Sequence, residues 1–194
     1  MKFLFILLFA TLSYSQNIFH STQFEFAMQE PSGWIKAEQN EAIKNLKDNI
    51  KLPEETINKA IENNKGTIEI ITFFKYPLNS VNGVVPTIKV NLRKNPAKTI
   101  DNFKKMMENS ITTIKKTFPK FKVTKMPTVI QLDGKNCVYF ESVNFIPNIN
   151  GEEEVRTITY AVPVGNKFFQ INFMDTKEDD NGKIFSEIIK TIQL

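Results

Sequence analysis

The chain has 194 residues, of which 41% are hydrophobic, and a formal net charge of +4. That length is sufficient for a single domain with a substantial core. Because Cys137 is the only cysteine, an intrachain disulfide is excluded, and because His20 is the only histidine, Ser-His-Asp and Cys-His nucleophiles and most zinc sites are disfavoured. The glycine-rich patterns GxGxxG, GxxxxGK[ST] and GxSxG are also absent.

The first residues, MKFLFILLFATLSYSQ, have the layout of a secretory signal peptide. Lys2 supplies the positive charge, residues 3–10 form an apolar run, and the small residues Ser13 and Ser15 precede a cleavage site. The apolar run is shorter than a membrane span, and no cysteine at the cut offers a site for lipid attachment. We expect residues 1–15 to be removed and residues 16–194 to form a single exported domain, periplasmic or extracellular, without a transmembrane segment. An uncleaved anchor is the alternative.

The first predicted elements are two strands joined by a turn. Apolar and polar residues alternate over residues 24–28, which predicts a half-buried strand. Pro31 and Gly33 suit a type I turn that returns the chain, as a hairpin, into a strand beginning at Trp34. We interpret this tryptophan as a residue that covers one end of the core, and not as a ligand-binding group.

Further elements follow in the first half of the chain. Residues 37–64 have the pattern of two short helices. The β-branched and aromatic residues of 67–76 predict a strand that is apolar on both faces, and alternation over 88–92 predicts another. A turn-rich loop at 77–86 separates these two strands.

A long amphipathic helix is predicted after Thr99, its N-cap. Its core face consists of apolar residues at helical spacing: Ile100, Phe103, Met107, Ile111, Ile114 and Phe118. One polar flank is a candidate basic patch, made up of Lys98, Lys104, Lys105, Lys115 and Lys116. The opposite flank has no charge and is a candidate partner-binding surface, made up of Met106, Asn109, Ser110, Thr113 and Thr117. Contact with a neighbouring loop of the same domain is the alternative for this second flank.

Positive charge is concentrated in the middle of the chain. Residues 89–125 contain eleven lysines and arginines and only two acidic residues. This segment could meet an anionic partner or form a solvated lysine surface. The aromatic residues of the basic segment belong to the core face of the helix, and nucleic-acid binding is therefore not expected.

Two hairpins and a helix are predicted for the rest of the chain. The first hairpin joins 121–132 to 136–145 across Asp133-Gly134, and the second joins 155–164 to 167–175 across Gly165-Asn166. A last helix follows, capped by Asp179, Asp180 or Asn181.

No metal site or cofactor is expected. The acidic loop at 175–182 invites comparison with a calcium-binding EF-hand, but Lys177 would occupy the first ligand position and Ile188 the position of the bidentate glutamate. Cys137 lies in an apolar run and is predicted to be a small core residue, not a reactive thiol.

The order of these elements resembles that of the PsbP-like family, including the bacterial periplasmic DcrB type. A strand leads into the sequence PSGW, and a helical segment precedes the strands TIEIITFFKY and TIKVNLRK. The long helix, two hairpins and a terminal helix ending in SEIIKTIQL complete the pattern. The resemblance implies an α+β fold in which an antiparallel sheet is flanked by helices, as an α-β-α sandwich. It also implies a mostly non-enzymatic, protein-binding role, and no functional residue of the family has a matching motif here.

Two functional hypotheses follow, and a third has no constellation of residues to support it. The first is a non-enzymatic adaptor or chaperone-like module of the cell envelope that binds another envelope or secreted protein. The alternative is a carrier of a small amphiphilic ligand, held between the sheet and the helices. The third, an enzyme, is not expected because the sequence contains no set of catalytic groups.

Overall fold

The computed structural model describes residues 17–37, 55, 66–78, 80–148 and 151–194. In these ranges a seven-stranded antiparallel sheet has the strand order β3-β4-β5-β9-β8-β7-β6, and a separate two-stranded sheet pairs β1 with β2. The strands are β1 (Ile18–Ser21), β2 (Phe26–Gln29), β3 (Ile35–Lys36), β4 (Ile68–Phe74), β5 (Thr87–Lys94), β6 (Lys122–Leu132), β7 (Lys135–Asn148), β8 (Gly151–Val164) and β9 (Lys167–Thr176). The helices are α3 (Ile100–Thr117), α4 (Gly182–Ile188) and the 3-10 helix η1 (Ile189–Thr191).

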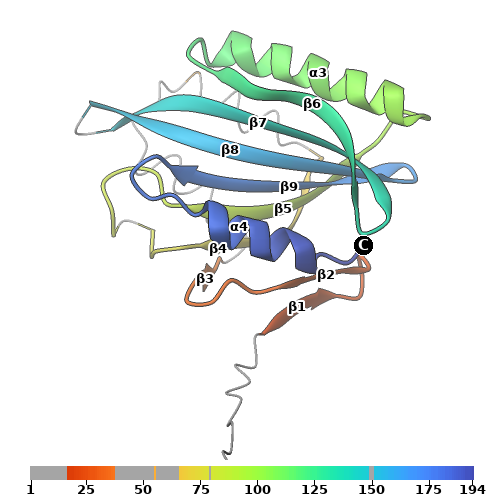
Figure 1. Cartoon of the computed structure of the whole chain (residues 1–194), viewed down its shortest axis with the longest axis horizontal. Coiled ribbons are helices and arrows are strands. Elements are labelled where there is room, and N and C mark those ends of the chain that lie inside the picture. Colours follow the sequence, from red (N-terminus) through yellow and green to blue (C-terminus); the bar gives the residue numbers. More distant parts are fainter. Residues whose placement is uncertain (1–16, 38–54, 56–65, 79, 149–150) are drawn as a thin grey trace, which may run out of the picture.

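Helices lie on both faces of the large sheet, which confirms the predicted α+β sandwich (Figure 1). On one face, α4, η1 and β2 pack on the central strands, and Phe26 and Phe185 are both almost fully buried there. The sheet contributes Phe73, Ile88, Val90, Ile171 and Phe173 to this larger core.

On the other face α3 covers only part of the sheet. Phe103 and Met107 of α3 pack against Val138, Ala161 and Phe168. The rings of Phe103 and Phe168 meet edge-to-face, with their centroids 5.2 Å apart. The sheet residues of this smaller core lie on β7, β8 and the start of β9, and none lies on β5, so the β5 side of the same face extends beyond the helix.

The two later hairpins form as predicted. β6 pairs with β7 across Asp133 and Gly134, whose φ angles of 48° and 70° are both positive, as a two-residue hairpin turn of type I′ requires. β8 pairs with β9 across Gly165 and Asn166. Long strands with local turns therefore build the β9-β8-β7-β6 half of the sheet.

The first predicted hairpin is wrong in its pairing. β2 pairs with β1, a strand that was not predicted, whereas β3 pairs with β4 of the large sheet. The turn runs from Pro31 to Trp34, whose N–H donates to the Pro31 carbonyl at 3.2 Å, and Gly33 has a φ of 77°, as at the third position of a type II turn. This turn joins two sheets instead of two paired strands. Trp34 does pack on the larger core, at 6.1 Å from the Phe185 ring, as its interpretation as a core residue requires.

An ion-pair cluster fixes the acidic loop to the sheet. Asp175 is 1% exposed and accepts hydrogen bonds from Arg156 at 2.9 and 2.6 Å and from the Asn181 N–H at 2.8 Å. Arg156 also pairs with Asp180, which accepts from the Gly182 N–H at the start of α4. Asn181 occupies the N-cap position, but its side chain makes no capping bond. The acidic side chains thus hold α4 in place. In the described ranges, no group of three side chains that could ligate a metal ion is found.

Two predictions fall outside the described residues. These are the signal peptide at 1–15 and, apart from Ala37 and Glu55, the pair of helices at 37–64. None of the helices in the described ranges has the length and apolar character needed to cross a membrane.

Candidate ligand-binding groove

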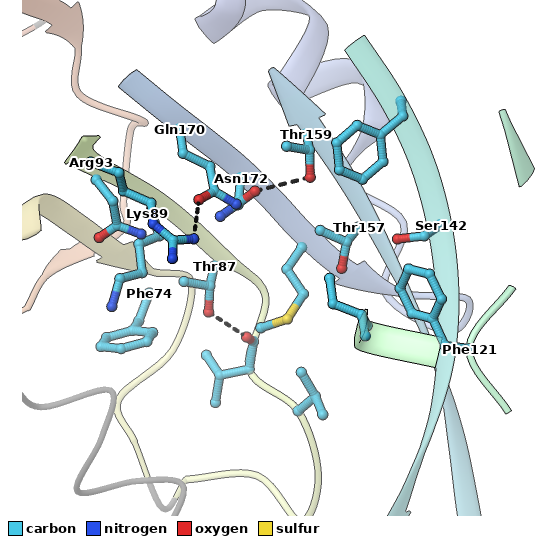
Figure 2. A pocket seen from close by; sticks show the side chains of 16 residues that line it. Phe74, Thr87, Lys89, Arg93, Phe121, Ser142, Thr157, Thr159, Gln170 and Asn172 are labelled. Carbon is cyan, nitrogen blue, oxygen red and sulfur yellow. Dashed lines mark hydrogen bonds between the residues drawn. The ribbon is translucent and has the colours of Figure 1, made fainter. Parts of the chain in front are cut away.

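A groove of about 420 Å³ lies on the α3 face of the sheet, between the C-terminal half of α3 and the loop that joins β4 to β5 (Figure 2). Strand alternation builds its floor, because successive side chains of a strand point to opposite faces. On β5, Ile88, Val90 and Leu92 enter the larger core, and the intervening side chains face the groove. The floor consists of Thr87, Lys89, Asn91 and Arg93 of β5, Gln170, Asn172 and Met174 of β9, Thr157 and Thr159 of β8, and Phe140 and Ser142 of β7.

The walls of the groove are apolar. One wall is formed by Phe74 at the end of β4 and by Val84 and Val85 of the following loop. The other is formed by Ile114 of α3 and Phe121, just before β6. The groove therefore combines a mainly polar floor with apolar sides.

The β4–β5 loop is held in place by Glu153 of β8. The Glu153 carboxylate accepts a hydrogen bond from the Val84 N–H at 2.8 Å. Gly83 precedes this contact with a φ of 147°, and a Cβ at that position would lie 2.4 Å from the carboxylate oxygen. Glycine is required here for its backbone conformation, and a Cβ would displace the flexible Glu153 side chain from its contact with the loop. The valine wall thus has a defined position over the floor.

Both cations of the floor have acceptors. Lys89 pairs with Glu69 at 2.6 Å, and the other oxygen of that carboxylate accepts from Thr72 at 2.9 Å. The Arg93 guanidinium donates to the Gln170 side-chain oxygen at 3.1 Å, and its pKa is lowered by desolvation. Since an arginine remains charged even so, the floor keeps two positive groups. The carboxylate of Glu69, which is not among the lining residues, neutralises Lys89.

The neutral polar side chains of the floor differ in whether their hydrogen-bonding atoms have partners. Thr159 donates to the Asn172 side-chain oxygen at 3.0 Å, and Thr87 donates to the Val85 carbonyl at 2.7 Å. Asn91, by contrast, is only 6% exposed, and its Oδ1 finds no hydrogen-bond partner in the structure as described. A buried acceptor without a partner is costly and uncommon in folded proteins. Asn91 therefore contributes an unsatisfied acceptor that is itself closed to solvent.

The candidate partner-binding surface lies outside the groove. Asn109, Ser110 and Thr113 are exposed, Thr117 is half-buried, and Met106 is half-buried beside the smaller core. The hydroxyls of Ser110, Thr113 and Thr117 donate to carbonyls one turn earlier in α3. Their partner-binding role stays a prediction.

The candidate basic patch is also on the outer surface of α3. Lys98, Lys105, Lys115 and Lys116 are exposed, and Lys104 pairs with Glu108 at 3.4 Å. Its interaction with an anionic partner remains a prediction as well.

The groove itself was not identified from the sequence. Lys89, Asn91 and Arg93 were used only as the polar half of an alternating strand pattern. The sequence did contain a signal of the groove, namely the polar row of β5 opposite its apolar row. Because β5 is paired on both sides, that polar row lies inside the sheet instead of at its edge. The carrier hypothesis places its ligand between the sheet and the helices, and the groove on the α3 face has a mainly polar floor.

Cys137 is fully buried in the larger core. Desolvation raises the pKa of its thiol to about 12. A thiol that stays protonated is a poor nucleophile, which agrees with the predicted structural role.

Comparison with known proteins supports the fold. No family model matches the sequence, and no curated protein matches it either. The solution structure of cyanobacterial PsbP (CyanoP) from Synechocystis sp. PCC 6803 superposes with a TM-score of 0.56 at 11% identity, covering 95% of both chains. A crystal structure from Bacteroides thetaiotaomicron gives a TM-score of 0.51 at 15% identity. The match covers 92% of this chain but only about half (48%) of the other protein's length.

A third similar structure is LpqN, involved in cell envelope biogenesis of Mycobacterium tuberculosis. Its TM-score is 0.48 at 12% identity, over 94% of this chain and 88% of LpqN, which is too low to support a functional comparison. The match to CyanoP over nearly the full length of both chains agrees with the strand and helix order described above. The chain has the PsbP-like fold.

Proposed function

We propose that this chain is an exported, non-enzymatic binding module that holds a small amphiphilic molecule in the groove between α3 and the β4–β5 loop. The observation that carries the proposal is the groove itself, because its mainly polar floor faces apolar walls. Its volume of about 420 Å³ falls within the usual range for small-molecule sites. The signal-peptide pattern of residues 1–15 supports export.

The lining residues support binding more than catalysis. Among the described residues of the groove there is no histidine, cysteine or carboxylate, and Lys89 is held by Glu69. Nucleophilic and general acid–base catalysis both require a reactive group placed beside a proton carrier. The groove contacts a ligand through amides, hydroxyls and apolar side chains instead.

The adaptor hypothesis is the second candidate, favoured by the uncharged, exposed surface of α3. If this surface binds a partner, Thr113→Glu weakens complex formation without loss of stability, since Thr113 is exposed. The change at Met106 is less informative, because this side chain packs beside the smaller core.

Native mass spectrometry of the protein, purified gently from its own envelope, tests the proposal. We expect an added mass of a few hundred daltons that disappears on denaturation. The matched variant is Thr157→Phe, which places a ring in the groove opposite Met174. This variant should retain the fold and lose the added mass.

A bare wild-type chain, or the same added mass on both proteins, would contradict groove binding. A second polypeptide bound to both proteins, with no small molecule on either, would favour the adaptor.

A further inference from the structure

We propose that the lysine-bearing surface of α3 docks the protein onto an anionic phospholipid membrane. This surface is the candidate basic patch, and none of its lysines lines the groove. The inference goes beyond the proposed function, because it concerns the surface to which the protein is held and not the molecule that it carries. It depends on the placement of the lysines, on the few carboxylates near them and on the side chains that surround them.

The lysines within α3 form two rows along its solvent-facing side. An α-helix turns about 100° and rises about 1.5 Å per residue, so residues eleven apart lie nearly on one line, roughly 16 Å from each other. Lys104 and Lys115 make up one row, and Lys105 and Lys116 make up the other. The apolar face of the same helix packs on the sheet, so both rows are left on the outer surface of the molecule.

Few carboxylates offset these charges. Asp101 and Glu108 are the only acidic residues of α3, and Lys104 pairs with Glu108 at 3.4 Å. The other four lysines of the basic patch have no ion-pair partner among the described residues. Five lysines against two carboxylates give the surface a net charge of +3. An anionic membrane attracts each nearby basic residue enough to raise binding roughly fivefold, so this surface should favour such a membrane by roughly a hundredfold.

The surroundings of the lysines favour lipid over an acidic protein. Protein interfaces are enriched in aromatic side chains and arginine and depleted of lysine. Phe103, the only aromatic residue of α3, is buried, and the helix contains no arginine. A lysine ammonium is a hydrated point charge on a flexible stem, which suits a diffuse layer of headgroups. The signal-peptide pattern of residues 1–15 predicts export across a membrane, so a lipid surface is at hand.

Docking through this surface places the groove near the membrane but not in contact with it. Ile114 lines the groove from the inner side of α3, whereas Lys115 and Lys116 follow on the outer side of the same turn. The groove would therefore lie about one helix diameter, roughly 10 Å, from the headgroups. Thr113 is on the uncharged flank, about a third of a turn from the midline of the two lysine rows, and stays away from the lipid.

Vesicle co-sedimentation tests the inference. The probes are vesicles of phosphatidylcholine alone and vesicles in which about a third of the lipid is the anionic phosphatidylglycerol. We expect the mature wild-type protein to bind the anionic vesicles at least about tenfold more tightly at low salt. In half-molar sodium chloride the Debye length falls to roughly 4 Å, and this preference should disappear.

Paired substitutions separate the α3 surface from the net charge of the protein. Lys105→Glu/Lys115→Glu changes one exposed lysine in each row and should abolish the preference for anionic vesicles, whereas Lys105→Gln/Lys115→Gln should retain part of it. The matched control is Lys183→Glu/Lys190→Glu, at exposed positions of α4 and η1 on the opposite face of the sheet (Figure 1). The control makes the same change in net charge and should keep the preference. Thermal unfolding of each variant verifies that it is folded.

Three results would overturn the inference. Equal binding to neutral and anionic vesicles, or binding to neither, would exclude lipid and leave an acidic protein as the partner of these lysines. An equal loss in the control variant would show that net charge, and not α3, attracts the vesicles. Loss of vesicle binding in Thr157→Phe would assign the interaction to the groove.

The proposed function can fail separately. Vesicle binding that Thr157→Phe retains and Lys105→Glu/Lys115→Glu loses would support docking through α3. If the wild-type protein then carried no added mass in native mass spectrometry, the proposed function would be contradicted and docking through α3 would stand.

Discussion

Replacing Asn91 by leucine should make the ligand-free protein more stable. Leucine has the same branched shape as asparagine. The substitution removes the Asn91 side-chain oxygen, an acceptor without a described partner in a residue that is only 6% exposed. An unsatisfied buried polar group costs about 1–3 kcal/mol, so we expect the free energy of unfolding to rise by about 1–2 kcal/mol. In a chain of this size that corresponds to an increase in Tm of roughly 3–6 °C.

Urea denaturation and calorimetry measure this change, and Asn109→Leu is the matched control. Asn109 is exposed, so its replacement should stay within about 0.5 kcal/mol of the wild-type protein. A loss of more than about 1 kcal/mol would refute the reasoning, because it would mean that Asn91 is hydrogen-bonded in the free protein, for example to a buried water.

Three further predictions concern other parts of the fold. Arg156→Met should cost about 3 kcal/mol in urea denaturation, because it leaves the Asp175 carboxylate buried without its cation. Adding Asp175→Asn should recover part of that loss, and an unchanged stability in the single variant would contradict the role of the pair. Gly83→Ala should weaken ligand binding, measured by calorimetry, because it disturbs the loop wall. Gly151→Ala is the control, since Gly151 also has a positive φ but open space around its Cβ, and it should not weaken binding. Equal effects of the two variants would show that the loop is not part of the site. For Cys137, the unfolded thiol ionises near its ordinary pKa of 9.0 and the folded one at about 12, so the native state binds more protons in that window. Its stability should therefore fall between these pH values at a rate of up to about 1.4 kcal/mol per pH unit. Cys137→Ala should remove that part of the slope, and a slope unchanged by the substitution would refute the assignment.

Elements with strong local signals were predictable from the sequence. The turn at Asp133 and Gly134 specifies its own hairpin, and the apolar spacing of α3 together with the Thr99 cap specifies that helix. The Thr99 hydroxyl accepts from the Asn102 N–H at 3.2 Å, as expected for an N-cap. These features depend on residues that are neighbours in sequence.

The pairing of the N-terminal strands was not predictable in the same way. The turn between Pro31 and Trp34 is compatible with a hairpin and equally with a chain that crosses between sheets. The choice is made by distant partners: Ala27 bonds to Gln193 near the C-terminus, and Ile35 pairs with Phe74. Turn chemistry alone does not contain that information.

The groove depends on non-local structure even more strongly. Alternation along β5 shows that Asn91 and Val90 face opposite ways, but it does not show which face is covered, or by what. Asn91 is buried because β5 lies in the middle of a seven-stranded sheet, and the groove exists because α3 covers only part of that face. The polar row was visible in the sequence, whereas its burial was not.

The central claim is that a small amphiphile binds in the groove, and an NMR titration of the labelled protein with lipid extracted from its own envelope tests it most directly. We expect the backbone amides of Asn91, Thr157 and Gln170 to shift together on titration. Those of Trp34, in the core on the opposite face, and Thr113, on the outer surface of α3, should remain unchanged. Shifts confined to Thr113 and its neighbours on α3, or no shifts at all, would contradict binding in the groove.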